Sequence, residues 1–563
     1  MKKQWKLKSK ANEQLVAELQ ERLGVAKIVA ELLVQRGITS FETAKKFFRP
    51  ELDHLHDPFL MKDMEQAVVR LQSAIEQEEK ILVYGDYDVD GTTAVSLMYS
   101  FIKSIHKNVE YYIPDRYAEG YGVSFKGIDY ASTNQFSLII ALDCGIKAID
   151  QVTYGQEKGV DFIICDNHRP AETVPKAIAV LDPKQHDCTY PYKELSGCGV
   201  GFKLIQAYCQ KSEIPFENII PYLDLLVISI AADIVPLSGE NRVLAYYGLE
   251  QLNANPRAGL KALMEVSDRD RSFTISDVVF GLAPRINAAG RIEHGSKAVE
   301  LMVHDDMEAA RVKAQQVNQH NLTRRKLDQS ITEEALQMIV PDAKSTVVFH
   351  PDWHKGVIGI VASRLIETYY RPTIVLTESN GKLAGSARSV KGFDVYNAIE
   401  ACCKYVEQFG GHKYAAGLTL KKENLQAFTA KFEEVVSSTI QEEMLNPQIS
   451  VDVELIISEI NHKLYRILRQ MAPFGPRNMS PVFMSKKVVD RGYGRKIGQE
   501  QTHLKLSVTD ANRSQFVDCI GFGMADKFEL IKDGQQFDIA YALEENEWNG
   551  NVNLQLRLKD IRS

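Results

Sequence analysis

Three aspartates stand at alternate positions early in the chain, in the segment VYGDYDVDGTT. Asp86, Asp88 and Asp90 directly follow Ile81–Gly85, an apolar run of strand length. Carboxylates this close together repel one another unless a cation neutralises them. The pattern D-x-D-x-D-G also opens a calcium-binding EF-hand loop, but that loop needs a preceding helix and a later glutamate, where this chain has Leu97. The segment therefore predicts a divalent metal site at the end of a strand.

Further metal-compatible side chains follow other apolar runs at comparable positions. Asp143 follows LIIAL, the triplet Asp166-Asn167-His168 follows FIIC, and Asp233 ends the run LLVISIAA. Oxygen ligands with at most one histidine, and no cluster of thiolates, suit Mg²⁺ or Mn²⁺ better than zinc. A single aspartate after a strand is usually only a cap, but together these residues predict a two-metal site.

Alternating strand-like and helical segments predict the framework that positions these side chains. The strand-like runs lie at 81–85, 138–142, 162–165 and 177–181, and helical patterns occupy 92–105 and 148–158. This alternation predicts an α/β domain with a doubly wound parallel sheet. Ligands of such sheets bind outside the carboxyl ends of the strands, so we expect the acids to meet at one edge.

The rest of the chain divides by pattern. A polar stretch at 307–338 predicts a connecting helix, and a second α/β block follows Pro341. From about Ile449, five strand-like segments with turns such as Trp548-Asn549-Gly550 predict a β-barrel of OB type, a common oligonucleotide-binding module, although a β-domain that only packs is the alternative. We expect five parts in chain order: a helical lead-in (1–60), a parallel-sheet domain (61–305), a connecting helix (306–340), a smaller α/β domain (341–445) and the barrel (446–563).

Composition and charge exclude several classes of protein. The chain of 563 residues exceeds one domain, and 45% apolar and 25% charged residues are typical of globular proteins. A net charge of −7 gives no bulk attraction to nucleic acid but allows local basic grooves. Eight cysteines without a C-x-x-C pair predict reduced thiols. No apolar segment approaches the ~20 residues of a membrane span, so we expect a cytoplasmic protein without a membrane partner.

Several ordered motifs resemble a known family. They are YGDYDVDGTTA, ALDCG, DNH, AADIVPL and LAPRINAAGR, followed by HKGVIGIVASRL, GSARS and GGH. From about residue 60 to the end, the chain resembles the DHH phosphoesterase superfamily and, within it, the RecJ exonucleases, which act 5′→3′ on single-stranded DNA. The resemblance implies a DHH domain, a DHHA1 domain and an OB-fold domain.

The resemblance also implies roles for the acids and the histidine. It makes Asp86, Asp88, Asp90, Asp143 and Asp233 the acidic metal shell, with Asp143 bridging two ions of Mn²⁺ or Mg²⁺. Two such ions would activate a water and stabilise the attacking and leaving oxygens. The catalytic residues would be Asp88, Asp90, Asp143 and His168, the last touching the scissile phosphate or assisting proton transfer.

One position departs from the family pattern. The family triplet is Asp-His-His and its first histidine is a metal ligand, whereas this chain has Asn167 there. An amide oxygen can bind either cation, but it replaces an imidazole that Mn²⁺ accepts well. We therefore expect Asn167 as a metal ligand that weakens the second ion or changes its preference.

Arginines in loops near strand ends predict phosphate binding, since their planar forks fit phosphate oxygens. Salt-bridging surface arginines are the plainer interpretation. By resemblance, the 5′-terminal phosphate is held by arginines and Ser386, and the strand by a glycine–histidine pair. The substrate-binding residues expected are Arg116, Arg285, Arg291, Ser386, Arg388, Gly411 and His412.

With the acids and arginines, the resemblance implies an exonuclease that releases 5′-mononucleotides from single-stranded DNA, in DNA repair and recombination. Single-stranded DNA is the expected partner, and the resemblance adds a single-strand-binding protein and a RecQ-type helicase, with a monomeric chain. The alternatives are a relative with weakened or lost catalysis that mainly binds single-stranded nucleic acid, and an enzyme for short oligonucleotides or smaller substrates. A P-loop is excluded because Gly381-Lys382 is followed by Leu383 and lacks the upstream glycine.

Overall fold

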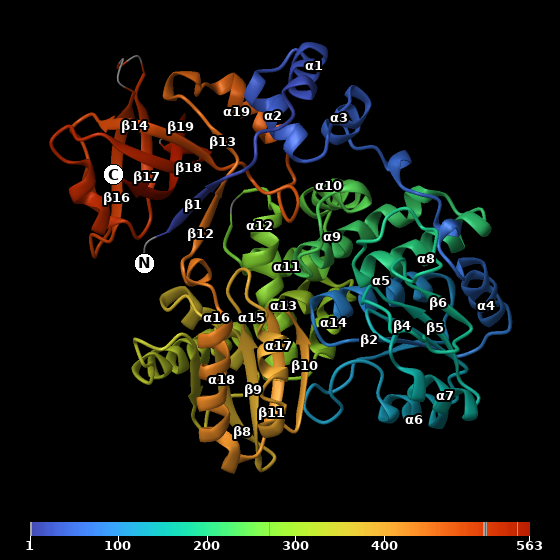
Figure 1. Ribbon diagram of the computed structural model, residues 1–563. Helices are drawn as coiled ribbons and strands as arrows, with labels where there is room; N and C mark the ends of the chain where they lie inside the picture. Colours follow the sequence, from blue (N-terminus) through green and yellow to red (C-terminus); the bar gives the residue numbers. More distant parts are fainter. Residues whose placement is uncertain (1–2, 270, 511–512, 514, 549) are drawn as a thin grey trace. The chain divides into compact units, whose positions relative to one another are not determined.

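The computed structural model describes residues 3–563, except 270, 511–512, 514 and 549 (Figure 1). The turn predicted at Trp548-Asn549-Gly550 therefore includes a residue outside this set. The chain forms two compact units, and each is described by itself. Lys45–Thr323 with Met471–Met479 form one, and Met1–Ala44, Arg324–Gln470 and Ser480–Ser563 form the other. Among the described helices, none combines the length and the apolar character needed to cross a lipid bilayer.

The unit built around residues 45–323 contains the predicted parallel sheet. Its strand order is β3-β2-β4-β5-β6, and every pairing is parallel. The strands are β2 (Ile81–Gly85), β3 (Val109–Tyr112), β4 (Leu138–Leu142), β5 (Asp161–Cys165) and β6 (Ala179–Leu181). The carboxyl ends of β2, β4 and β5 are therefore neighbours at one edge.

Alternate residues of each strand enter different cores, as a doubly wound sheet requires. Ile81 and Val83 join the core beneath α4, α5, α8 and α9, whereas Leu82 and Tyr84 join the core beneath α6 and α7. The helices are α4 (Met64–Glu76), α5 (Val89–Ile105), α6 (Phe125–Thr133), α7 (Ile149–Glu157), α8 (Gly197–Lys211) and α9 (Leu223–Ala232). The predicted fold class is confirmed for this unit.

Asp233 differs from the other acids because a helix, not a strand, precedes it. The apolar run before it forms α9, and Asp233 caps the carboxyl end of that helix. A continuous apolar run suits a buried helix as well as a buried strand, and here the helical choice packs α9 against α5 and α10. The remaining helices are α10 (Gly239–Ala254), α11 (Ala258–Glu265), α12 (Ile275–Asp277), α13 (Ala283–Ile292), α14 (Ser296–Met302) and α15 (Met307–Gln337), the last being the predicted connecting helix.

The other unit contains a second sheet of order β10-β11-β9-β8-β7. Its strands are β7 (Thr346–Phe349), β8 (Thr373–Ser379), β9 (Lys382–Arg388), β10 (Gln408–His412) and β11 (Ala415–Leu420). The helices are α16 (Ile358–Thr368), α17 (Val395–Glu400) and α18 (Leu425–Thr439). The sequence analysis did not predict β10, because its two consecutive glycines are poor strand formers.

The same unit contains the barrel, whose five predicted strands are all present. They are β14 (Phe483–Asp490), β16 (His503–Thr509), β17 (Val517–Gly521), β18 (Phe537–Trp548) and β19 (Asn551–Arg562), joined by the short strands β13 (Val453–Glu454) and β15 (Arg495–Ile497). The order is β13-β14-β18-β19-β17-β16-β15, and a further pairing of β14 with β16 closes the sheet. The parallel pairing of β17 with β19 is the connection expected of an OB fold.

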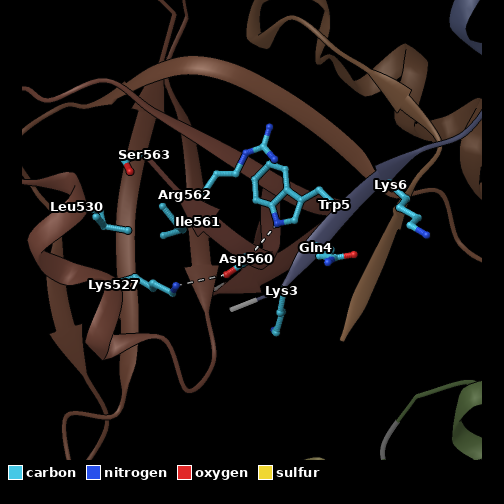
Figure 2. Close-up of a pocket in the computed structure, with 10 residues that line it drawn as sticks. All are labelled: Lys3, Gln4, Trp5, Lys6, Lys527, Leu530, Asp560, Ile561, Arg562 and Ser563. Atoms are coloured by element: carbon cyan, nitrogen blue, oxygen red, sulfur yellow. Dashed lines mark hydrogen bonds and ion pairs between the residues drawn. The ribbon is translucent and has the colours of Figure 1, made fainter. Parts of the chain in front are cut away.

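The first strand of the chain docks beside this barrel. β1 (Gln4–Leu7) pairs in parallel with β12 (Gln448–Val451), and the indole Nε1 of Trp5 donates to Asp560 at 2.8 Å (Figure 2). The guanidinium of Arg562 stacks 4.3 Å from the centre of the Trp5 ring. Strand β1 therefore packs against the end of β19 in the barrel through Trp5. Three helices follow β1 in sequence: α1 (Glu13–Leu23), α2 (Lys27–Gln35) and α3 (Phe41–Phe48). A further helix, α19 (His462–Gln470), lies between β13 and β14.

Candidate metal centre

The acids predicted at strand ends meet at the carboxyl edge of the parallel sheet. Asp86 follows β2, Asp143 follows β4 and Asp166 follows β5, and these three strands are adjacent. Asp143 has a left-handed backbone with φ of 57°, which turns its side chain out of the strand direction. The start of α8 approaches so closely that a β-carbon on Gly197 would lie 2.5 Å from Cβ of Asp143. Only glycine fits there.

Asp86 provides the clearest evidence that a cation fits this site. The residue is fully buried, and its Oδ2 has no hydrogen-bond partner among the described residues. Burial, and then the neighbouring charge of Asp88, raise the pKa of Asp86 well above its ordinary value. A buried carboxylate oxygen without a donor is costly unless a proton or a metal ion satisfies it. The donor set, all carboxylates near Asp86, suits a hard divalent cation.

Asp88 and Asp90 play different structural parts. Asp88 is the N-cap of α5 and accepts from the amide of Gly91 at 3.0 Å. Asp90 is buried in the first turn of α5, and its oxygens accept from three groups that belong to α8 and α9. These donors are the amides of Gly197 and Cys198, at 2.7 and 2.9 Å, and Oγ of Ser229, at 2.6 Å. Burial raises the pKa of Asp90 to about 6.

Asp143 is the most crowded of the acids. Burial, followed by the charges of Asp90, Asp88, Asp233 and Asp166, raises the pKa of Asp143 well above its ordinary value. The charges of the other carboxylates therefore act on Asp143 at short range. Its role as a bridge between two ions stays a prediction.

The triplet positions an imidazole against an acid that the sequence analysis had not assigned. Oδ1 of Asp166 accepts from Nδ1 of His168 at 2.7 Å and from the amides of Asn167 and His168. This hydrogen bond raises the pKa of His168 to about 9. Burial alone would raise the pKa of Asp166, but the bonds from His168 and the backbone hold it below its ordinary value. Asp166 thus fixes the orientation of the His168 ring and favours its protonated form.

Candidate ligand atoms of three of these residues cluster tightly. One atom each from Asp143, Asp166 and His168 lie within 4.8 Å of one another. Because Nδ1 of His168 is already hydrogen-bonded to Asp166, the carboxylates are the better ligands for a cation.

The side chain of Asn167 faces Asp233. Its Nδ2 donates to Oδ2 of Asp233 at 3.1 Å, and its backbone oxygen accepts from Nζ of Lys184 at 2.5 Å. Desolvation by the surrounding protein, then the charges of Asp90 and Asp88, raise the pKa of Asp233 to about 8. The structure therefore brings Asn167 and Asp233 together with the strand-end acids, although Asp233 comes from a helix.

Tyr121 belongs to the site and was missed by the sequence analysis. Its hydroxyl lies 3.2 Å from Nε2 of His168 and donates to the backbone oxygen of Asp143 at 3.4 Å. The residue is 54% exposed, and its ring packs edge-on against Tyr87. The only signal in the sequence was its place between two glycines in the loop after β3, which is too common to be specific.

Two of the predicted arginines lie around Tyr87. The guanidinium of Arg116 stacks 3.9 Å from the Tyr87 ring, and its Nε donates to the oxygen of Gly290 at 2.9 Å. The charges of both Arg116 and Arg291 act on Tyr87, opposing the effect of burial on its pKa. Since Tyr87 separates Asp86 from Asp88, these arginines border the acidic cluster.

Arg285 has a different environment. Its Nε donates to Oδ1 of Asn318 at 2.9 Å and its Nη1 donates to the oxygen of Gly281 at 2.6 Å, so it fastens α13 to neighbouring segments. The expectation that Arg285 and Arg291 lie in loops was wrong, because both are on α13. A proline near the start of the run concealed this helix, although proline is tolerated in a first helical turn.

Ser386 and Arg388 form a separate polar site in the other unit, on β9 rather than in a loop. Nη1 of Arg388 donates to Oγ of Ser386 at 3.1 Å. A β-carbon on Gly359, near the start of α16, would lie 2.9 Å from both Oγ of Ser386 and Nη2 of Arg388. Burial lowers the pKa of Arg388, and no described carboxylate forms an ion pair with it. A half-buried cation beside a helix amino end suits an anion.

The glycine–histidine pair lies at the edge of the same sheet. Gly411 pairs with Ala416, and Ala416 pairs with Ala387 between Ser386 and Arg388. A β-carbon on Gly411, whose φ is 141°, would lie 2.4 Å from the oxygen of Ala415. His412 is exposed on β10. The pair Gly411–His412 on β10 and the pair Ser386–Arg388 on β9 are therefore separated by one strand, β11.

Comparison with known proteins agrees with this arrangement. The family models that match are the DHH family N-terminal domain at 80–230, the DHHA1 domain at 342–438 and the RecJ OB domain at 451–560. The single-stranded-DNA-specific exonuclease RecJ of Bacillus subtilis is 38% identical over 99% of this chain and 71% of its own length.

Solved structures of RecJ from Thermus thermophilus have the same fold. The structure with Mn²⁺ has a TM-score of 0.85 at 26% identity, covering 100% of this chain and 79% of its own. The structure with Mg²⁺ has a TM-score of 0.79 at 25% identity, covering 100% and 78%. From the motifs, the domains and these similarities together, the chain belongs to the RecJ family of single-stranded-DNA-specific exonucleases.

Proposed function

We propose that this chain is a single-strand-specific 5′→3′ DNA exonuclease that hydrolyses phosphodiester bonds with two ions of Mn²⁺ or Mg²⁺ and releases 5′-mononucleotides. One observation supports it most strongly. Six carboxylates converge near one sheet edge, where Asp86 keeps a buried oxygen without a described partner and His168 is hydrogen-bonded to Asp166 beside them. Such a site combines cation ligands with a proton donor.

The ligands in this proposal come from four elements. Asp86, Asp88, Asp143 and Asp233, with the amide oxygen of Asn167, would hold the ions, and Asp143 would touch both. When bound, the ions supply an activated water and stabilise the attacking and leaving oxygens. Asp90 already accepts from three protein donors, so we assign it to holding α8 and α9 against the motif.

His168 and Tyr121 would act on the substrate side. His168, fixed by Asp166 through Nδ1, would contact the scissile phosphate or give a proton to the departing oxygen. Tyr121 orients the same ring through Nε2. Binding of the phosphate would require this second contact to open, because both use the same nitrogen.

Recognition of the 5′ end would rest on cations outside the metal shell. Arg388 and Ser386 form a cradle for a phosphate in one unit, and Arg116 and Arg291 border the acids in the other. Arg285 is committed to packing, so between the two arginines of α13 we favour Arg291 as a phosphate ligand. The domain limits, a monomeric chain, a single-strand-binding protein and a RecQ-type helicase remain predictions.

A single digestion tests the proposal. A single-stranded oligonucleotide with a 5′-phosphate and a 3′-fluorophore is incubated with Mn²⁺ or Mg²⁺, alongside a blunt duplex of the same sequence. We expect the labelled strand to shorten from its 5′ end and mononucleotides to accumulate. Shortening from the 3′ end, or equal cutting of the duplex, would contradict the proposal. Binding of the strand without any cutting would favour the second candidate, a DNA-binding relative with weakened catalysis, for which Asn167 is the motivating residue.

A further inference from the structure

A short segment from the C-terminal half of the chain belongs to the unit that holds the metal centre. Met471–Met479 follows α19 and precedes β14 in sequence, yet it packs with Lys45–Thr323. The guanidinium of Arg242, which is only 4% exposed, donates to the oxygens of Met471 at 3.0 Å and Ala472 at 2.9 Å. A buried cation bound by backbone oxygens is a strong anchor, because leaving those groups unpaired would be costly.

Within this segment, four residues form a tight turn. Gly475 and Asn478 exchange backbone hydrogen bonds of 3.0 and 2.9 Å, and Nδ2 of Asn478 donates to the oxygen of Met471 at 2.8 Å. Pro476 and Arg477 occupy the two central positions. The second has φ of 61°, a left-handed value that glycine normally supplies at this point of a turn. The turn holds an arginine in a conformation that its β-carbon disfavours.

The turn is fastened to the loop that follows Asp233. The amide of Leu237 donates to the oxygen of Pro476 at 2.8 Å. The contact is close, since a β-carbon on Gly475 would lie 2.5 Å from Cδ1 of Leu237. Asp233 stands four residues before Leu237, so the position of the turn is tied to the loop that begins at the metal centre.

The charge of Arg477 has no ion-pair partner among the described residues, and its side chain is exposed. Two large apolar side chains close by in the sequence are also exposed: Ile234, three residues before Leu237, at 66%, and Met479, two residues after Arg477, at 64%. A cation without an ion-pair partner on a turn hydrogen-bonded to its neighbours suits the anionic phosphate of a nucleotide, and exposed apolar groups suit its base and sugar.

We propose that Arg477 is a binding residue for a backbone phosphate of single-stranded DNA, next to the Asp233 side of the metal centre. This inference rests on the proposed function and deepens it, since it assigns a strand contact to a segment outside the acidic motifs. It also gives a reason for an arginine at a position where glycine would be unstrained.

The test separates binding from hydrolysis. Affinity for a fluorescein-labelled single strand is measured by fluorescence anisotropy in EDTA, at several salt concentrations, for the full chain and Arg477→Gln. We expect about a tenfold weaker affinity, as for loss of one charged hydrogen bond, and a salt slope smaller by ~0.7, as for loss of one phosphate contact. Arg477→Lys should keep most of the affinity and the slope.

The matched control is Lys107→Gln. Lys107 is also exposed and lies just before β3, so it stands at the amino edge of the parallel sheet, opposite the acids. This variant loses the same charge and should bind DNA like the wild type. Arg477→Gly should lose affinity while raising the melting temperature, because glycine relieves the left-handed strain; this excludes misfolding as the cause.

Three outcomes are decisive. If Arg477→Gln binds the strand as tightly as Lys107→Gln does, the inference is wrong while the proposed function stands. If the wild type neither binds nor cuts single-stranded DNA, the proposed function fails first. If Arg477→Gln loses affinity for a polyglutamate peptide but not for DNA, the turn binds an acidic protein and the inference is overturned.

Discussion

Nδ1 of His168 lies 2.7 Å from Oδ1 of Asp166, two residues earlier in the same loop. Asp166 also receives the amides of Asn167 and Ile146, so its carboxylate is fixed from several sides and cannot turn away. The pair therefore sets both the orientation and the charge of the imidazole. This arrangement differs from a metal-bound histidine, which must be neutral at the ligating nitrogen.

Asp166→Asn should shift the pH dependence of catalysis. The pKa of His168, raised to about 9 mainly by its hydrogen bond to Asp166, should return toward its ordinary value of about 6.5. If protonated His168 is the active form, the rate falls as pH rises through that pKa, so the alkaline limb of kcat/KM should move to lower pH in the variant. While Asp166 is ionised, the raised pKa of His168 also adds stability that is fully present below pH 6.5 and is lost as pH rises through about 9.

The measurement is kcat/KM between pH 5.5 and 9.5, with an NMR titration of the His168 ring in both proteins. Asp150→Asn, at an exposed acid of α7, is the control and should leave the profile unchanged. An unchanged alkaline limb in Asp166→Asn would show that His168 does not donate a proton.

Asp143→Asn should abolish turnover and, without metal, stabilise the protein. Burial and four neighbouring carboxylates raise the pKa of Asp143, so its charge is unfavourable when no cation is bound. We expect a loss of rate of ~10³-fold or more and a higher melting temperature in EDTA at pH 8. Mn²⁺ should raise the melting temperature of the wild type more than that of the variant. Turnover within a few-fold of the wild type would refute the bridging role.

Asn167→His should restore the family ligand. The imidazole suits Mn²⁺ better than an amide oxygen does, so the variant should need several-fold less Mn²⁺ for half its maximal rate. Affinity for DNA, which depends on the arginines, should stay nearly constant. Titrations of Mn²⁺ and Mg²⁺ against both proteins decide the matter. An identical metal dependence would mean that residue 167 does not touch an ion.

Gly359→Ala should weaken recognition of the 5′-phosphate. The new methyl group would lie 2.9 Å from both Ser386 and Arg388 and fill the space between them. We expect the preference for a 5′-phosphorylated over a 5′-hydroxyl strand to fall by about fivefold or more, as for loss of one charged contact. Ser363→Ala, one turn later on α16 and exposed, is the control. A preference equal to that of the control would place the terminal phosphate elsewhere.

The sequence by itself determined the parallel sheet and the strand-end acids of the candidate site. Asp86 and Asp143 could be grouped from their positions alone, because parallel strands carry their carboxyl ends to one edge whatever the rest of the fold does. Asn167 stood out for the same reason, as the residue after the end of β5 and its aspartate. The sequence pattern was enough to group site residues wherever a residue's position along a strand determines its position in the sheet.

Only the tertiary structure decided how segments from other elements complete the site. Asp233 reaches it from the end of a buried helix and Tyr121 from a loop, and the turn of Arg477, our proposed strand contact, lies more than two hundred residues away from Asp233 in sequence. Arg285, which looked equivalent to Arg291, is used in packing. These positions depend on which helix faces pack together and on which backbone oxygens accept hydrogen bonds from the buried Arg242. Such contacts form between surfaces, and no spacing along the chain encodes them.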